Sequence, residues 1–243
     1  MLSRTSTALS ALLALPLLAL LSLPALADSD EPWRQMRTAD ERIDVETWRR
    51  PVEDNSIDAF RGRVEVPHSL PVVLAVLGDI DNFPEWVFQC DDTEFHPEEW
   101  GPDIIRIVIE GIWPVSDRDV VTRSSLKQDD NNLAVTIRTR AANDILEEQP
   151  GFVRIPALDN TFVMKPLEDG WTRITFTTFV DPGGRIPAWL ANFVATRAPL
   201  TTLRDMSARM ELDRYQDPNL EDMPILLPGT EDLRFPEAHR NPS

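Results

Sequence analysis

The sequence predicts an α+β fold, in which one curved antiparallel sheet wraps around a long helix near the carboxyl end. Short alternating stretches recur between residues 103 and 180, separated by Pro, Gly, Asp or Asn, as is typical of antiparallel strands. One short helical pattern precedes this series. A long helical pattern follows it, after the breakers Pro182, Gly183 and Gly184. Strands followed by a terminal helix indicate α+β rather than alternating α/β.

The first part of the chain is expected to form two strands and a helix. The helix begins after Ser69, because Pro71 then lies in the first turn, where its missing N–H is not needed. The expected elements are a short helix within 28–40, strands at 42–49 and 59–67, the helix from 69, and a turn with two aromatics at 81–86.

The second part of the chain is expected to form the rest of the sheet and the long helix. Pro199 removes one helical hydrogen bond and clashes with the preceding turn, so we expect the first turns, about 186–198, to bend relative to the rest. The strands are expected at 103–114, 119–127, 133–141, 151–157, 160–167 and 171–180, and the helix at 185–214 with one apolar stripe of Trp189, Phe193, Leu200, Leu203 and Met210, widened by Leu190 and Val194.

The first 27 residues have the pattern of a secretory signal peptide. One Arg precedes an apolar run, and Ala25 and Ala27 form a small-residue cleavage site. We expect cleavage after Ala27 and export to the periplasm or the outside. An uncleaved anchor is the alternative, although Pro16 and Pro24 interrupt the run. The expected units are the signal peptide 1–27, a short segment 28–40, the folded domain 41–214, and a Pro- and acid-rich tail 215–243 that is either docked or loose.

The charge excludes one class of partner. The chain has 24 basic and 41 acidic residues and a net charge of −17, and the leader contributes one Arg and no acid. Such a surface repels nucleic acid, which needs clustered Lys and Arg. It also repels anionic lipid headgroups on average, so any membrane contact should be local, apolar and transient. No stable protein partner is predicted.

The sequence contains no recognisable catalytic or metal motif. His68, His96 and His239 are scattered without paired metal-ligand spacing, and no Gly-rich phosphate loop or G-x-S-x-G is present. Cys90 is the single cysteine, which excludes an internal disulfide and favours a small buried side chain. No catalytic residue, metal or cofactor is therefore predicted.

Charged residues indicate which face of each strand is wet, because side chains alternate across a strand. Arg106 with Glu110, Arg123 with Lys127, and Arg138 with Arg140 mark outer faces. The opposite face mixes aliphatic and hydroxyl side chains without ionisable groups. This pattern fits either a plain core or a small-ligand cavity, and the hydroxyls favour the cavity. The inner face also carries Leu126, Phe162, Thr172 and Val180. The inner residues expected to contact a ligand are Ile105, Ile107, Ile109, Thr122, Ser124, Val135, Ile137, Thr139, Met164, Ile174, Phe176 and Thr178.

Three segments carry a resemblance to a known family. "FPEWV" (83–87), "GIWPVSDRDVV" (111–121) and "FVDPGGRIPAWLANFVATRAPLTTL" (179–203), taken together, resemble the START family of StAR-related lipid-transfer domains over about residues 40–214. The resemblance implies a helix-grip fold with a tunnel that encloses one lipid. It implies that Leu190, Phe193 and Leu200 of the helix face the ligand, and that a loop, expected at 142–150, opens with the helix.

The resemblance also concerns ligand chemistry. Sterol-type members place a buried acid and an Arg in the tunnel, and the matching positions here are Ile105 and Ser124, both uncharged. We therefore expect a neutral or weakly polar lipid, with its polar group near Thr122, Ser124 or Thr139. Within the resemblance, the Asp117–Asp119 segment is a structural turn.

Two other functions remain open from the sequence. Helix-grip proteins include cyclases and hydrolases, so an enzyme acting on a hydrophobic small molecule is the alternative to a lipid carrier. A partner-binding module that uses the acidic tail is a third hypothesis. Turnover of the bound molecule would indicate the enzyme, and a chain without a filled cavity would indicate the module.

Overall fold

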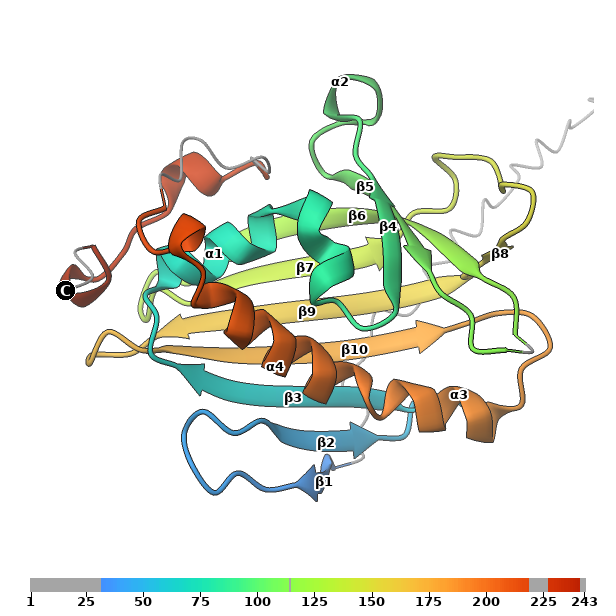
Figure 1. Cartoon of the computed structure of the whole chain (residues 1–243), viewed down its shortest axis with the longest axis horizontal. Helices are drawn as coiled ribbons and strands as arrows, with labels where there is room; N and C mark the ends of the chain where they lie inside the picture. The colour runs from blue at the N-terminus through green and yellow to red at the C-terminus, as the bar shows by residue number, and fades with distance from the viewer. Residues whose placement is uncertain (1–31, 114, 219–226, 241–243) are drawn as a thin grey trace, which may run out of the picture.

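The computed structural model describes residues 32–113, 115–218 and 227–240. These residues form a ten-stranded sheet of order β1-β2-β3-β10-β9-β7-β6-β5-β4, with β8 paired to β6 off this path. The sheet curves around the helices on one of its faces (Figure 1). The strands are β1 (Arg34–Arg37), β2 (Glu46–Arg50), β3 (Ala59–Val66), β4 (Cys90–Glu94), β5 (Ile104–Ile109), β6 (Arg118–Gln128), β7 (Val135–Ala141), β8 (Val153–Arg154), β9 (Ala157–Pro166) and β10 (Thr172–Asp181).

The strands predicted from alternation are present, and two edge strands were not predicted. The described part of the expected helix, residues 32–40, is not helical, because Arg34–Arg37 pair with β2 as the edge strand β1. Trp33 lies beneath Arg50 and Arg61, whose guanidinium carbons are 4.7 and 4.1 Å from the ring centroid. At the other edge, β4 has the polar sequence CDDTE, which alternation does not identify as a strand.

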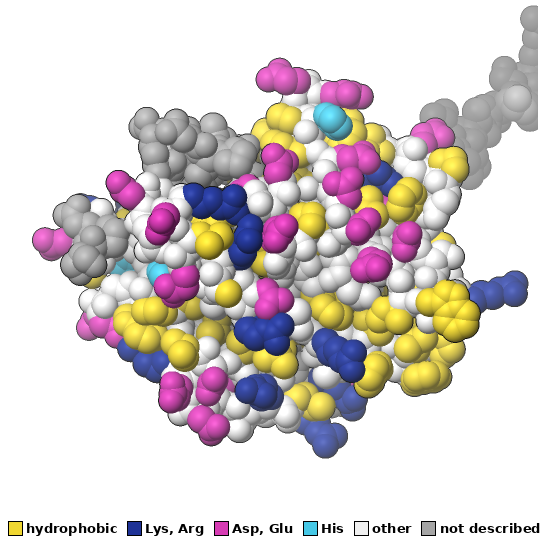
Figure 2. All heavy atoms as spheres, in the orientation of Figure 1, with side chains coloured by type: hydrophobic (Ala, Val, Ile, Leu, Met, Phe, Trp, Pro, Cys, Tyr) yellow, Lys and Arg dark blue, Asp and Glu magenta, His cyan; other side chains and the backbone are white. Residues whose placement is uncertain are grey.

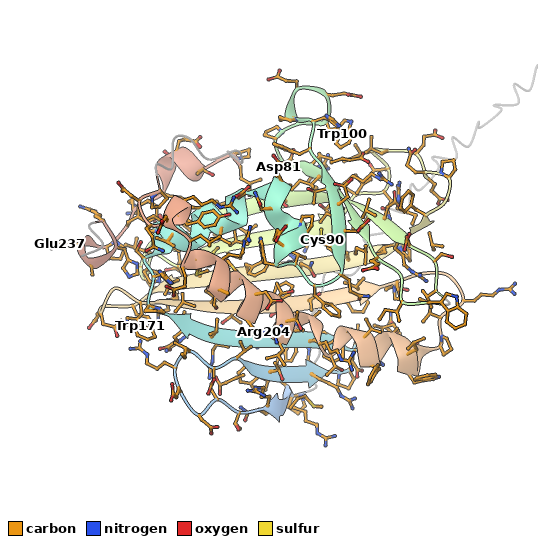
Figure 3. The ribbon with its side chains drawn as sticks, in the orientation of Figure 1. Asp81, Cys90, Trp100, Trp171, Arg204 and Glu237 are labelled. Atoms are coloured by element: carbon orange, nitrogen blue, oxygen red, sulfur yellow. The ribbon has the colours of Figure 1, made fainter. Side chains whose placement is uncertain are left out.

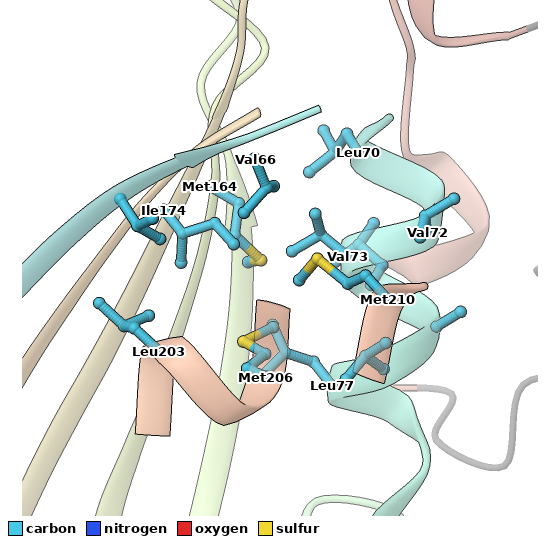
Figure 4. Close-up of a cluster of buried hydrophobic side chains, with 14 of the residues drawn as sticks. Val66, Leu70, Val72, Val73, Leu77, Met164, Ile174, Leu203, Met206 and Met210 are labelled. Carbon is cyan, nitrogen blue, oxygen red and sulfur yellow. The ribbon is translucent and has the colours of Figure 1, made fainter. Parts of the chain in front are cut away.

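The core lies between the sheet and two helices that cross its concave face. Leu203, Met206 and Met210 of α4 are fully buried, and they pack with Met164 and Ile174 of the sheet. Figure 4 shows Met206 and Met210 pointing into the space between the sheet and α1. The helices are α1 (Leu70–Gly78), the 3-10 helix η1 (Ile80–Glu85), α2 (Pro97–Trp100), α3 (Ala188–Ala195) and α4 (Ala198–Met210), followed by the 3-10 turns η2 (Asp213–Tyr215), η4 (Thr230–Asp232) and η5 (Glu237–His239).

The C-terminal helix is two helices rather than one. It breaks at Thr196–Arg197, and Pro199 lies in the first turn of α4, where no backbone donor is required. The expected bend is confirmed, but the single apolar stripe is wrong. Trp189 and Phe193 of α3 are 71% and 55% exposed, whereas Leu203 is fully buried. The break therefore changes which side of the helix faces the sheet.

Helix α4 rests directly on β3 at a glycine. A Cβ atom at Gly62 would lie 2.8 Å from Leu203 Cδ1 and 2.9 Å from Pro199 Cβ. These distances are shorter than ordinary contacts between carbon atoms, so only glycine permits this approach. Gly62 thus fixes the seam between the sheet and the helix that it grips.

A cluster of charged side chains is buried on the face of β5 and β6 that points away from the helices. Asp119 is fully buried and accepts hydrogen bonds from Arg106 Nε at 2.9 Å and from Arg154 Nε and Nη2 at 2.9 and 3.0 Å. Arg106 also pairs with Glu94. The prediction that Arg106 faces water is therefore wrong, because Asp119 and the ring of Phe152, 5.0 Å away, cover it.

The carboxyl-terminal tail is docked where the structure describes it. Tyr215 donates a hydrogen bond to Asp79 at 2.6 Å, and Leu227 and His239 are buried. The predicted leader 1–27 lies outside the described residues. Among the described residues, no helix combines the length and apolar character that crossing a bilayer requires.

Candidate functional site: a two-chambered cavity

The sheet and the helices enclose two chambers. The outer chamber has a volume of about 190 Å³ and lies beside α3, the start of α4 and the described part of the β5–β6 loop, residues 110–113 and 115–117. Its wall is mainly apolar and includes Val180, Ile186, Leu190 and Val194. A water molecule needs only about 10–15 Å³ on the same measure. The chamber therefore has room for a much larger guest.

The inner chamber has a volume of about 120 Å³ and lies beneath α1 and η1. Leu74 and Leu77 of α1 form one wall, and Ile105 and Ile137 of the sheet form another. The two chambers adjoin, since both are lined by Val87, Ile107, Asn160, Phe176 and Thr202. Both chambers are largely apolar, and we refer to the adjoining pair as the hollow.

Most of the predicted ligand-facing residues line this hollow. Ile107, Ile109, Phe176, Thr178 and Leu190 line the outer chamber, and Ile105, Ile107, Thr122, Ser124, Ile137, Thr139 and Phe176 line the inner one. Five predicted residues line neither. Val135, Met164 and Ile174 are fully buried in the core beside α1 and α4, and Leu200 packs against that core. Phe193 points to solvent.

A row of neutral polar side chains crosses the hollow. Ser124, Thr139, Asn160 and Thr178 lie at paired positions on the adjacent strands β6, β7, β9 and β10, so they share the inner face. We call them the polar row. Ser124 Oγ and Thr139 Oγ1 are 2.8 Å apart, so one hydroxyl donates to the other and the second retains a free hydrogen.

Asn160 is the member of the polar row that sequence reasoning missed. Its Oδ1 is buried without a hydrogen-bond partner, and the residue lines both chambers. An unpaired buried carbonyl costs free energy unless a ligand or water donates to it. The outward-facing Asp159, which pairs with Arg138, implies by alternation that Asn160 faces inward.

One cation lines the outer chamber, contrary to the expectation of an inner surface without ionisable groups. Arg118 is 6% exposed, donates to the carbonyl of Ser116, and has an unpartnered Nε. Burial lowers the pKa of its guanidinium, and the charge of Asp117 partly offsets that effect. Asp117 accepts a hydrogen bond from Gly111 N, which agrees with a structural turn here.

The thiol of Cys90 also borders the outer chamber, on β4 (Figure 3). Burial, with Asp92 and Asp91 nearby, raises its pKa to about 12, so it is a neutral thiol at physiological pH. The described residues contain no group of His, Cys, Asp or Glu side chains placed to hold a metal ion.

The loop beside the outer chamber is the β5–β6 loop, not the predicted loop 142–150. Residues 142–150 line neither chamber. Arg154 holds them over the face of the sheet that points away from the chambers, by donating to the carbonyls of Leu146 and Glu147 at 2.9 and 3.0 Å.

Large apolar side chains are exposed on both sides of the outer chamber. We call Ile112, Trp113, Trp189 and Phe193 the apolar rim; they are 48%, 89%, 71% and 55% exposed. Figure 2 shows hydrophobic side chains gathered at this end of the molecule, near α3.

A curved antiparallel sheet gripping α4 around an apolar hollow defines a helix-grip protein. The sequence model of the START domain matches residues 18–214, which is most of the chain, and the chain belongs to the START domain family. This family membership supports lipid binding and transfer as its general function.

Individual relatives agree with this assignment. An uncharacterised protein of Pseudomonas aeruginosa is 25% identical over 181 residues, 74% of this chain and 88% of that protein. The human phosphatidylcholine transfer protein is 24% identical over 141 residues, 56% of this chain and 65% of that protein. The crystal structure of a STAR-related lipid transfer protein fragment from Xanthomonas axonopodis has a TM-score of 0.66 and 27% identity, covering 74% of this chain and 99% of that one. Human StAR-related lipid transfer protein 5 shares the fold, with a TM-score of 0.58 and 17% identity, covering 74% of this chain and 88% of that one.

Proposed function

We propose that this protein is a non-catalytic carrier that encloses one lipid in the two-chambered hollow and passes it between membranes after export. The observation that carries the proposal is an apolar hollow, far larger than a water site, beside an exposed apolar rim. Each buried methylene contributes about 0.8 kcal/mol, so burial alone supplies affinity for a long apolar molecule.

Native mass spectrometry of protein made in its own host tests this function. We expect one lipid per chain, and we expect the loaded protein to move that lipid unchanged from donor to acceptor vesicles. An empty protein that acquires no lipid from vesicles would contradict the proposal. A chemically altered product would instead favour the alternative, a helix-grip enzyme acting on a hydrophobic substrate.

The polar row supports a neutral or weakly polar lipid. Its amide and hydroxyl groups can bond a hydroxyl, ester or amide of the guest, and no charged side chain belongs to it. Arg118 lies in the outer chamber, where a phosphate-bearing guest would place its phosphate. If the lipid extracted from the native protein were mainly anionic phospholipid, the proposal of a neutral lipid would be contradicted. The proposed carrier function would still stand.

Replacing Asn160 by Leu should change ligand affinity and protein stability differently. The empty protein should keep or gain stability, because an unpartnered buried carbonyl is removed. Lipid binding should weaken by about three- to tenfold, the value of one net hydrogen bond. Affinity for the extracted lipid and thermal unfolding of the empty protein measure the two effects. Thr161→Val, on the outward face of the same strand, is the matched control, and equal affinity in both variants would exclude Asn160 as a ligand contact.

The apolar rim is proposed to insert into the membrane while the lipid leaves. Aromatic side chains favour the membrane interface, and this contact avoids the acidic remainder of the surface. Trp113→Ala with Trp189→Ala should slow transfer by about tenfold or more, because burying each aromatic contributes about 1.5–3 kcal/mol. The amount of lipid bound per chain should not change. Vesicle transfer rates measure the effect, and Trp100→Ala, on α2, is the control. Unchanged transfer in the double variant would contradict insertion.

Helix α3 and the β5–β6 loop are proposed to form the gate. Val115 of the loop and Leu190 of α3 both line the outer chamber. In a Cys90→Ala background, a bifunctional thiol crosslinker would join Val115→Cys to Leu190→Cys. It should reduce lipid transfer to near the rate measured between vesicles without protein. Adding a reductant that cleaves the linker should restore it. Full transfer with the linker in place would show that the lipid leaves by another route.

A further inference from the structure

We propose that the carboxyl-terminal tail, residues 227–240, forms the end wall of the inner chamber and sets the length of the lipid that fits. The inference rests on the proposed carrier function and extends it to ligand selection. The START domain match ends at residue 214, so this wall comes from a segment outside the family domain.

Three tail residues line the inner chamber. Leu227 is 5% exposed, and Thr230 and Leu233 line the chamber with it. Leu74 and Leu77 of α1 line the same chamber. Gly229 adopts the left-handed conformation, φ +96°, that favours glycine, and it lies beside Leu126 of β6.

Hydrogen bonds hold the tail on both sides of the chamber. On the β6 side, Gln128 Nε2 donates to the carbonyl of Arg234 at 2.8 Å, and Gln128 Oε1 accepts from the backbone N of Arg234 at 3.0 Å. On the α1 side, His239 is fully buried, and its Nδ1 accepts from Leu70 N at 2.9 Å. The proton therefore sits on Nε2, which donates to the carbonyl of Leu167 at 2.9 Å. The tail is thus fixed as a wall of defined position.

The position of this wall limits the guest. Tail residues line only the inner chamber, whereas the α3 residues line only the outer one. A lipid that enters beside α3 and crosses the polar row therefore ends against Leu227 and Leu233. Interiors pack closely, so a side-chain change of a few carbon atoms at this wall changes the space available.

Opposite changes at one position test the inference. We would incubate the full chain with an equimolar series of saturated monoacylglycerols, from short to long, and identify the bound chain lengths by native mass spectrometry. Leu233→Ala should shift the preferred chain upward by about two carbons, and Leu233→Trp should shift it downward. Leu212→Ala, which removes the same atoms at a side chain 39% exposed and outside both chambers, should not shift it.

A second variant covers the case in which the substitutions at Leu233 unfold the tail. His239→Ala removes both buried anchors on the α1 side, and it should broaden the range of bound lengths while the START domain stays folded, as near-UV circular dichroism would report. An unchanged preferred length in both Leu233 variants, together with an unbroadened range in His239→Ala, would overturn the inference alone. An unaltered protein that binds neither the probes nor a native lipid would overturn the carrier function and this inference with it.

Discussion

Replacing Asp119 by Asn is expected to lower the free energy of unfolding by about 3–5 kcal/mol, because it leaves two buried guanidinium groups without their counter-charge. Asp119 is fully buried and bonds Arg106 and Arg154 with both carboxylate oxygens. Asn keeps the shape of the side chain but loses the charge and one acceptor. Urea denaturation measures the loss. This is the largest stability effect expected of any single substitution here.

The control for Asp119→Asn is Asp169→Asn. Asp169 pairs with Arg42 at 2.7 Å, but both side chains are about half exposed, at 49% and 45%. Solvent-exposed pairs contribute little to stability, so this variant should unfold at nearly the same urea concentration as the unaltered protein. Equal losses in the two variants would show that the Asp119 cluster is no more important than a surface pair.

The Asp119 cluster also predicts a pH dependence. Burial acts to raise the pKa of Asp119, but hydrogen bonds and charge from Arg154 and then Arg106 outweigh it and hold the pKa below the usual 3.8. A carboxyl group with a lowered pKa stabilises the fold fully at pH values above its ordinary pKa, and the stabilisation is lost as the pH falls through the folded-state pKa. Unfolding temperatures measured at decreasing pH should therefore fall more steeply for the unaltered protein than for Asp119→Asn. Parallel curves would contradict this assignment.

Introducing Ala at Gly62 is expected to cost about 1–3 kcal/mol through overpacking at the seam between β3 and α4. The new Cβ would meet Leu203 Cδ1 at 2.8 Å, Pro199 Cβ at 2.9 Å and the Pro199 carbonyl at 3.3 Å. Only the leucine can move aside easily, because the proline is fixed in the first turn of α4. The displaced helix should also weaken closure of the hollow, so lipid should exchange faster with vesicles.

A double-mutant cycle checks that the contact is responsible. Leu203→Ala alone should destabilise the core, whereas adding it to Gly62→Ala should cost less than the sum of the two single losses. The interaction energy comes from four unfolding curves. Strict additivity would mean that Gly62 is required for a reason other than the approach of α4.

The sheet could largely be predicted from the sequence because its wet and dry faces alternate. Arg123 and Lys127 correctly placed Ser124 on the inner face of β6, and Arg138 and Arg140 did the same for Thr139 on β7. The same reasoning failed at Arg106. Its partner Asp119, which also pairs with Arg154, lies on another strand, so local alternation cannot reveal that this cluster buries Arg106.

The cavity lining was harder to predict than the sheet. Inward-facing residues divide between the solid core beside α1 and the hollow beside α3, and this division depends on how α4 crosses the sheet. Met164 and Ile174 face inward as predicted, yet they fill the core. Trp189 and Phe193 fit a helical stripe, but the break at Thr196–Arg197 turns them to solvent. Periodicity alone does not locate such a break.

We expect the two parts of the C-terminal helix to open on different timescales. In α3 only Ala191 is buried, whereas α4 buries Pro199, Thr202, Leu203, Met206 and Met210. Regions with few buried contacts open locally at a fraction of the global unfolding free energy. Backbone amides of α3 should therefore exchange with deuterium much sooner than those of α4. Under the proposed gate, core substitutions that leave α4 in place should change the melting temperature while leaving the residence time of the lipid nearly unchanged.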